Sequence, residues 1–343
     1  MRTFFSSHST RLLTASVVVA LLVSACSSPV TGTPAALPTT IAPEIAVPIS
    51  PYNDWFRTLD PCGFVDGTTI AQWGVPIHFG NDTQMDTCSI EFAEPVTDAR
   101  IEGLSVSTGM GVDSTFVDLG GFMGTELPDS VMCSISVRFD DHQSFFVSAF
   151  GADFGLSSPE LFGNSVDARL CSRTRELIRA SVPLFSSQPL RSESTRSVQT
   201  ALMSKQPCGA VPELSRTYPK TTATTLREGD PFNCRIQTGV SVNKRDESGE
   251  VNIGFRQFPE SMADEPLTMF GEVEINLLGV VGHEEEEDNG YCTTRAFVGV
   301  GSGYPVQRRT ETETYIDVIQ LSGFGCERLR IAATAAVRAY QNG

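Results

Sequence analysis

Alternating hydrophobic and polar positions predict two similar sets of β-strands along the chain. The strands expected in the first set are residues 88–92, 101–109, 133–139 and 144–150. Those expected in the second set are residues 234–242, 251–258, 294–301 and 315–321. Residues 133–139 and 144–150 flank the turn sequence DDHQ, which predicts a β-hairpin. We expect each set to form an antiparallel sheet.

Each set of strands ends in a predicted amphipathic helix that begins at a cysteine. In residues 171–185, the expected buried face consists of Cys171, Leu177, Ile178 and Val182. In residues 326–340, it consists of Cys326, Leu329, Ala333, Ala336, Val337 and Tyr340. Near the start of the first set, Asp60 is expected to cap a short helix with Pro61 at its first position. These patterns predict an α+β fold of two tandem homologous domains, each an antiparallel sheet with flanking helices.

Apart from Cys26, the cysteines repeat along the chain in two groups of four. They are Cys62, Cys88, Cys133, Cys171, Cys208, Cys234, Cys292 and Cys326. The first and second are 26 positions apart, as are the fifth and sixth, while the third and fourth are 38 apart and the seventh and eighth 34. DPCG at 60–63 matches QPCG at 206–209, and DTCSI at 86–90 matches FNCRI at 232–236. These anchors indicate a tandem repeat of roughly 135 residues per unit.

An even number of cysteines in an exported chain is typical of a disulfide framework. Four cysteines allow three pairings in each unit. The favoured pairs are Cys62–Cys88, Cys133–Cys171, Cys208–Cys234 and Cys292–Cys326. The reason is that the separation within these pairs is kept between the units, whereas the separation between the middle cysteines grows from 45 to 58 positions. Because the chain has no Cys-x-x-Cys motif, we expect no metal and no redox site at these cysteines, and no cofactor.

The N-terminus has the features of a bacterial lipoprotein signal peptide. Arg2 and Arg11 accompany an apolar run from Leu12 to Val23, which is too short for a spanning helix of about 20 residues. The following VSAC resembles a lipobox that ends at Cys26. This resemblance implies cleavage before Cys26 and diacylglycerol (palmitate) attachment to its thiol, which anchors the protein to the cell membrane. An ordinary signal peptide with an incidental cysteine is the alternative.

The predicted organisation therefore has five segments. They are a signal peptide at 1–25, a Pro-rich tether at 26–51, a first repeat domain at 52–185, a polar linker at 186–199 and a second repeat domain at 200–343. The chain has a formal net charge of −16, and loss of the leader with its two arginines makes it more negative. This acidity disfavours nucleic acid as a partner.

A wider resemblance rests on the lipobox, the Pro-rich spacer and the motif Asp60-Pro61-Cys62 followed by Cys88. These features resemble the actinobacterial lipoproteins of unknown function that are defined by DPC and Cys-x-Trp motifs, here as a tandem pair. Residue 90 is Ile where that family has Trp, and Gln206 and Ile236 depart from the motifs in the second unit. A weaker likeness to extracytoplasmic sensor domains of mycobacterial receptor kinases is also present. Neither family implies a catalytic residue.

Three further stretches are candidates for chemistry. The acidic HEEEED run at 283–288 has carboxylates that suit a hard cation, but it lacks metal-loop spacing and is expected to form a solvated loop. The glycine-rich run at 299–305 is expected to be a turn, because it has no lysine and no phosphate-loop spacing. Phe116, Phe122 and Met123 are candidates for a flexible apolar lip over a ligand groove, with plain loop packing as the alternative. His142 is expected to be exposed.

The resulting functional hypothesis is a lipid-anchored protein on the extracytoplasmic face of the bacterial cell membrane. We expect it to be non-enzymatic and to bind a partner protein or a small lipid or cell-wall ligand, in a sensor-like role. No Gly-x-Ser-x-Gly elbow and no His-Glu-x-x-His motif is present. The alternatives are an envelope hydrolase whose site is assembled from distant residues, and a structural adaptor.

Overall fold

A computed structural model describes most of the chain after the predicted tether. The described residues are 51–81, 83–110, 116–128, 132–138, 143–151, 168–224, 230–242, 246, 249–264, 271–308 and 311–342. All of these described residues belong to one compact unit. The predicted signal peptide, Cys26, the tether up to residue 50 and His142 lie outside the described residues, whereas Pro51, the last residue of the predicted tether, begins a helix.

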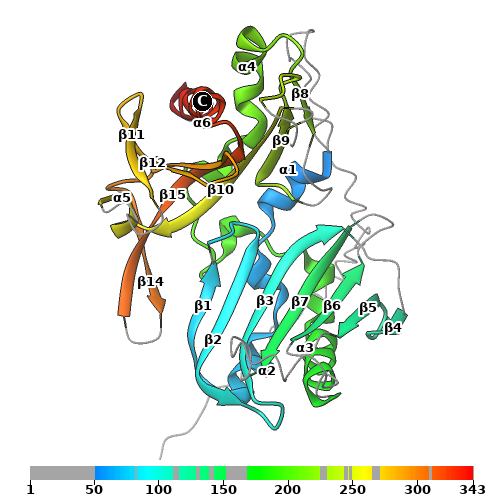
Figure 1. Ribbon diagram of the computed structural model, residues 1–343. Coiled ribbons are helices and arrows are strands. Elements are labelled where there is room, and N and C mark those ends of the chain that lie inside the picture. The colour runs from blue at the N-terminus through cyan, green and yellow to red at the C-terminus, as the bar shows by residue number, and fades with distance from the viewer. Residues whose placement is uncertain are drawn as a thin grey trace, which may run out of the picture. The chain divides into compact units, whose positions relative to one another are not determined.

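The N-terminal half contains a seven-stranded antiparallel sheet with the order β1-β2-β3-β7-β6-β5-β4 (Figure 1). Its strands are β1 (Pro76–Asn81), β2 (Thr87–Val96), β3 (Ile101–Met110), β4 (Phe116–Asp118), β5 (Met123–Pro128), β6 (Met132–Arg138) and β7 (Gln143–Gly151). The helices of this half are α1 (Pro51–Thr58), η1 (Pro61–Phe64), α2 (Gly67–Trp73) and α3 (Ala168–Ser187). β6 and β7 pair as the predicted hairpin.

The C-terminal half contains a second antiparallel sheet with the order β11-β12-β13-β15-β10-β9-β8, and β14 pairs additionally with β15. Its strands are β8 (Thr222–Thr224), β9 (Asn233–Gln237), β10 (Glu250–Pro259), β11 (Val273–Leu277), β12 (Val280–Glu286), β13 (Tyr291–Ala296), β14 (Tyr304–Arg308) and β15 (Glu311–Phe324). Its helical segments are η3 (Arg191–Glu193), η4 (Leu202–Ser204), η5 (Pro207–Ala210), α4 (Val211–Thr217), α5 (Ser261–Asp264) and α6 (Cys326–Asn342).

The two sheets share one strand order when β14 is set aside. β1, β2 and β3 take the places that β8, β9 and β10 take in the second sheet, and β7, β6, β5 and β4 correspond to β15, β13, β12 and β11. A helix follows the last strand in both halves, α3 in the first and α6 in the second. The mixed helix-and-strand class with antiparallel sheets, predicted from the pattern, is confirmed.

One long helix packs on each sheet and closes a hydrophobic core. α3 contacts β6 and β7, and α6 contacts β13 and β15 (Figure 1). Leu177 and Ile178 of α3 are buried as predicted, and so are Leu329 and Val337 of α6. Burial of an aliphatic side chain contributes about 1.5–3 kcal/mol, so these helical faces are major contributors to each core.

Two strand predictions extended too far, and several elements were missed. Residues 234–242 form a strand only to Gln237, because Gly239 has a positive φ of 70° that turns the chain. Residues 294–301 leave the strand after Ala296 and enter a turn, within which the glycine-rich run begins as expected. The short strands β1, β4, β5, β8, β11, β12 and β14 carried no distinct signal in the pattern.

Candidate functional site

Four cysteine pairs hold the helices to the sheets. The sulfur atoms are at bonding distance in Cys62–Cys88, Cys133–Cys171, Cys208–Cys234 and Cys292–Cys326, with Cα–Cα separations of 5.0, 5.3, 5.3 and 5.4 Å. These are the pairs predicted from the spacing. In each half, one pair joins a short 3-10 helix to a strand and the other joins the long helix to a strand. As disulfides they have no free thiolate, so they serve as staples.

The start of the first staple follows the sequence prediction closely. Asp60 is the N-cap of η1, its carboxylate accepts a hydrogen bond from the Cys62 backbone N–H at 2.9 Å, and Pro61 begins the helix. Gln206 precedes η5 in the C-terminal half without a side-chain cap. Its amide instead donates to Asp54 at 2.7 Å and accepts from Arg57 at 3.0 Å, and so ties η5 to α1.

An ion pair recurs four residues after the helix cysteine of each half. Arg175 of α3 bonds Glu126 of β5 at 2.6 Å, and Arg330 of α6 binds Glu284 of β12 through Nε at 2.9 Å and through Nη2 at 2.5 Å. Glu126 and Glu284 occupy matching registers, opposite Ile135 and Thr294. Each pair therefore fastens the long helix to the strand next to the one that carries the cysteine.

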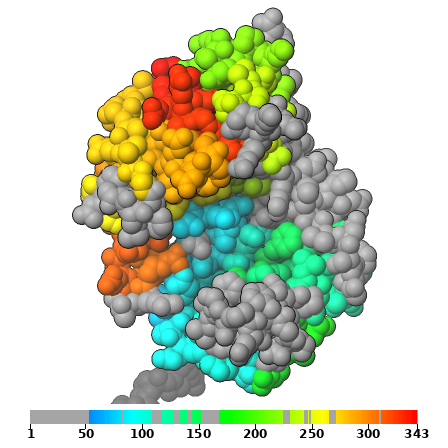
Figure 2. All heavy atoms as spheres, in the orientation of Figure 1, coloured from blue at the N-terminus to red at the C-terminus, as the bar shows by residue number. Residues whose placement is uncertain are grey.

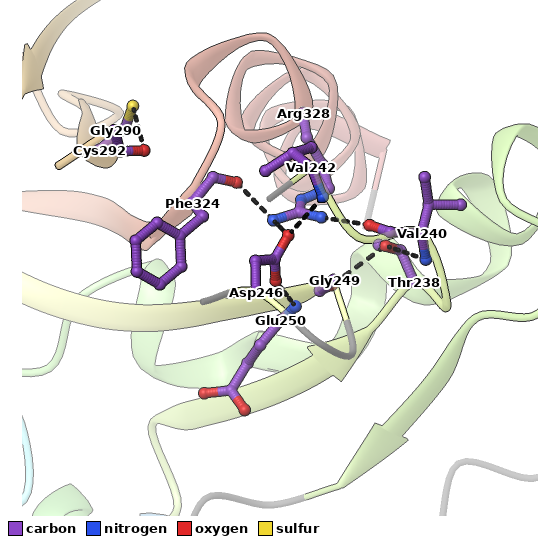
Figure 3. Close-up of polar contacts among 10 residues, drawn as sticks. All are labelled: Thr238, Val240, Val242, Asp246, Gly249, Glu250, Gly290, Cys292, Phe324 and Arg328. Carbon is purple, nitrogen blue, oxygen red and sulfur yellow. Dashed lines mark hydrogen bonds and ion pairs between the residues drawn. The ribbon is translucent and has the colours of Figure 1, made fainter. Parts of the chain in front are cut away.

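A second ion pair recurs two residues after the same cysteines. Arg173 pairs with Asp98 at 2.9 Å on the surface of the N-terminal half. In the C-terminal half, Arg328 pairs with Asp246 at 2.8 Å, and the side chains are only 3% and 1% exposed. Figure 3 shows the Arg328 guanidinium between Asp246 and the carbonyl oxygens of Val240 and Phe324.

The loop that encloses Arg328 is organised by Asp246 and Gly249. The Asp246 carboxylate also accepts from the backbone N–H groups of Val242 at 3.0 Å and Glu250 at 3.1 Å (Figure 3). Gly249 has a φ of 67°, and a Cβ there would lie 2.3 Å from Thr238 Oγ1 and 2.4 Å from the Val240 oxygen. Glycine is therefore required for the loop to close over the arginine.

The two sheets meet through a buried polar region, which we call the junction. It comprises residues 83–86, Glu91 of β2, the segment 189–205, the ends of β10 and β14, and Asp317 of β15. Gln84 forms an isolated β-bridge with Arg256, and the Gln257 N–H donates to the Thr83 oxygen at 2.9 Å. Arg308 of β14 pairs with Glu91 of β2. The coloured atoms of the two halves accordingly abut in Figure 2.

The predicted linker at 186–199 is part of the junction. It begins inside α3 and includes η3, where Arg191 is 4% exposed and donates to the Met85 oxygen. Ser197 bonds the capping residue Asp60. The Leu202 N–H, just beyond the linker, donates to Asp317 of β15 at 3.0 Å. Most of the linker residues are exposed, but Arg191 and Ser197 are buried, because their polar groups find partners in the junction.

Burial perturbs the charges of the junction. It lowers the pKa of Arg191 to about 10, against an opposing effect of Asp60 and Asp86. It also raises the pKa of Asp86 to about 6, with a further contribution from the nearby Asp230 and opposition from Arg256. The pKa of Asp317 is raised by burial as well. Burial therefore disfavours the charged form of each of these groups.

A third charged group lies on the face of the second sheet that is turned away from α6. We call Glu272, His283 and Arg295 the His283 cluster. Glu272 precedes β11, His283 lies on β12, and Arg295 lies opposite it on β13. Glu272 pairs with Arg295, and its other oxygen is 3.7 Å from His283 Nδ1. The side chains of Glu272 and His283 are both 1% exposed.

The prediction that the acidic run at 283–288 forms a solvated loop is wrong. Residues up to Glu286 belong to β12, and His283 and Glu284 are buried. Side chains alternate along a strand, so His283 faces the His283 cluster and Glu284 faces Arg330 of α6. Arg330 permits the burial of the Glu284 carboxylate, and within the acidic run only Glu286, Glu287 and Asp288 are exposed.

Two of the candidate lip residues, Phe122 and Met123, lie in different environments. Phe122 packs on the hydrophobic core of the N-terminal half, with its ring 5.7 Å from that of Phe185. Met123 is 50% exposed. Phe116 begins β4, and its side chain lies outside the described residues. Phe122 therefore serves the core, and Met123 is left as the exposed member.

Metal-ligand residue types come together in two places among the described residues. One group is Glu126 with Cys133 and Cys171, and the other is Glu286 with Cys292 and Cys326. In both, the sulfurs belong to a disulfide and so are poor metal ligands. Sequence reasoning missed Glu272, Arg295, Asp246 and the junction carboxylates, because isolated charged residues carry no spacing signal.

Within the described part of the chain, no helix is long and apolar enough to cross a membrane. No family model, curated protein or solved structure matches the chain.

Proposed function

We propose that this protein is an exported, lipid-anchored envelope protein that binds a ligand or partner without catalysis. Cys26 carries the anchor, residues 26–51 form the tether, and the folded part is displayed on the extracytoplasmic side of the membrane. The observation that carries the proposal is the set of four cysteine pairs at bonding distance. Such a framework persists in oxidising compartments, which agrees with the lipobox-like VSAC sequence.

We also propose that the folded part is a tandem pair of homologous domains, as in the resemblance to DPC-motif lipoproteins. The shared strand order supports this origin. So do the arginines two and four residues after each helix cysteine, which pair with carboxylates at corresponding places. Unrelated sheets have no reason to share such a set of contacts.

The non-enzymatic role is supported by the charged side chains, because those described above form structural contacts. Arg175 and Arg330 fasten helices to sheets, and Arg328 closes a loop. The charges of the junction bond the two halves. Charged groups engaged in this way stabilise a scaffold, and they are poorly placed to meet a substrate.

Metabolic labelling with an alkyne-bearing fatty acid tests the anchor. In a bacterial host with lipoprotein processing, the full chain should incorporate the label and fractionate with membranes. The C26A variant should lose the label and enter the soluble fraction, whereas a C62A variant keeps Cys26 and should remain labelled. Label on C26A would overturn the proposal.

Capture from envelope extract tests the binding role. The tethered protein, crosslinked in intact cells, should retain a protein or a lipid that the C26A form lacks. Recovery of neither would favour the structural adaptor. Turnover of an envelope substrate by the purified protein would favour the hydrolase.

A further inference from the structure

The His283 cluster ties an edge strand to the second sheet. β11 is the last strand of the described sheet order, with β12 and then β13 next to it. The Glu272 carboxylate reaches over β12 to pair with Arg295 of β13. His283 lies on the strand between them, and its ring meets Phe297 edge-on at 4.8 Å between centroids. The ion pair is thus a strap across β12, and the imidazole is enclosed with it.

The second ring nitrogen of His283, Nε2, is not hydrogen-bonded. His283 Nε2 is buried and has no hydrogen-bond partner, and the same holds for Arg295 Nε. Leaving a buried polar atom unbonded is costly, and a positive charge on the ring would add to that cost.

In the N-terminal half, the positions that correspond to His283 and Arg295 carry uncharged side chains. Thr125 of β5 is opposite Ser136 of β6 in the register in which His283 is opposite Arg295. Thr125 and Ser136 are buried too, at 3% and 2% exposure. The strand arrangement therefore forms with small neutral side chains, so the fold itself does not require the ionisable cluster of the C-terminal half.

The groups around the imidazole set the direction of its titration. Glu272 and Glu274 approach from the side of β11, Arg295 from β13, and the Ala263 backbone from α5. Glu284, the neighbour of His283 on its own strand, points to α6. Burial is the largest influence and, together with Arg295, holds the pKa of His283 below its ordinary value, although Glu272, Glu274 and a hydrogen bond with the Ala263 backbone oppose it.

We propose that the His283 cluster is an acid-sensitive latch on the β11 edge of the second sheet. At neutral pH the imidazole is uncharged and the strap is closed. In acid, the folded state disfavours protonation of His283, whereas the ring is protonated readily once β11 and β12 open. Opening is therefore favoured increasingly as the pH falls below about 6.5. An exported protein meets the pH of its surroundings, so the physiological setting rests on the proposed function, but the latch itself does not.

NMR titration of the purified mature protein tests the latch. We expect the His283 ring signals, assigned by their loss in H283Q, to titrate below about 6.5. Amide exchange of β11 and β12, corrected for the intrinsic effect of pH, should then be faster at pH 5 than at pH 7. The amides of β4 and β5 should show no such acceleration. A midpoint at or above about 6.5 would overturn the proposal.

Two variants separate the latch from a general effect of acid. H283Q should remove the acid acceleration at β11, because glutamine does not titrate in this range. The matched control is H78Q, since His78 is also buried but its Nε2 contacts the Asn81 oxygen at 3.2 Å. H78Q should leave the acceleration in place. Equal acceleration in H283Q and the parent protein would contradict the latch. Since these measurements use no membrane, their failure would leave the result at Cys26 unaffected.

Discussion

The arginine two residues after the helix cysteine has a different environment in each half of this protein. Arg173 and Asp98 form their pair in solvent, with side chains 35% and 53% exposed. Arg328 and Asp246 form theirs in the interior, 3% and 1% exposed. The two arginines hold the same position relative to the helix cysteine, and the two aspartates lie in corresponding loops. Even so, one pair is exposed on the surface and the other is buried. Equal motifs therefore do not imply equal energetic roles.

The loop between the second and third strands accounts for this difference. In the N-terminal half, β2 and β3 are joined by the short turn at 97–100. In the C-terminal half, β9 and β10 are separated by residues 238–249, and the described part of this loop wraps Arg328 (Figure 3). The longer loop excludes water from the ion pair, which strengthens the attraction but makes loss of one partner costly.

The largest predicted effect is the difference in stability loss between substitutions of Arg328 and Arg173. R328M leaves the buried Asp246 carboxylate without its cation and should lower the free energy of unfolding by about 3–5 kcal/mol. R173M removes a solvated pair and should cost less than about 1 kcal/mol. Urea denaturation followed by circular dichroism measures both. Similar losses in the two variants would show that burial does not distinguish the halves.

Removing the disulfide of the long helix should lower the stability of the protein by a similar amount in either half. The chain-entropy model assigns about 4 kcal/mol to closure of either loop, since the separations are 38 and 34 residues. C133A/C171A and C292A/C326A should therefore have nearly equal unfolding midpoints. A large inequality would mean that α3 and α6 depend differently on their staples, and amide exchange in each helix would identify the weaker one.

A smaller effect is expected where the halves meet. The folded-state pKa of Asp86 is raised to about 6, so the folded protein binds a proton more readily than the unfolded chain. This carboxyl group therefore favours folding in acid, and its contribution is lost as the pH rises from about 4 to about 6. D86N should gain at most about 3 kcal/mol at pH 7 and little at pH 4. Destabilisation of D86N at pH 7 would show that Arg191 and Arg256 require the negative charge.

The smallest effect concerns the two members of the proposed lip. F122A should cost about 1–2 kcal/mol, because its ring is only partly buried against the core. M123A should change stability by less than about 0.5 kcal/mol, since its side chain is half exposed. Thermal unfolding of both variants distinguishes them. Loss of ligand or partner capture in M123A, with unchanged stability, would restore a binding role for this residue.

The parts of the fold close to the cysteines were predictable from sequence. Asp60 caps its helix as expected because capping depends on neighbours within three residues. The paired strands at β6 and β7 were visible because their alternation and turn residues are local. β12 was missed because acidic residues disfavour a strand, and the counter-charge on the buried Glu284 comes from Arg330, far along the chain.

The sequence by itself determined the repeated cysteine pairs, the long helices that contain Cys171 and Cys326, and the antiparallel character of the strands. These features follow from spacing and periodicity, which a single chain displays directly. Only the tertiary structure decided which charges are buried. Asp246, His283 and Arg191 look like ordinary polar residues in the sequence, and their roles arise because distant segments exclude water and provide partners.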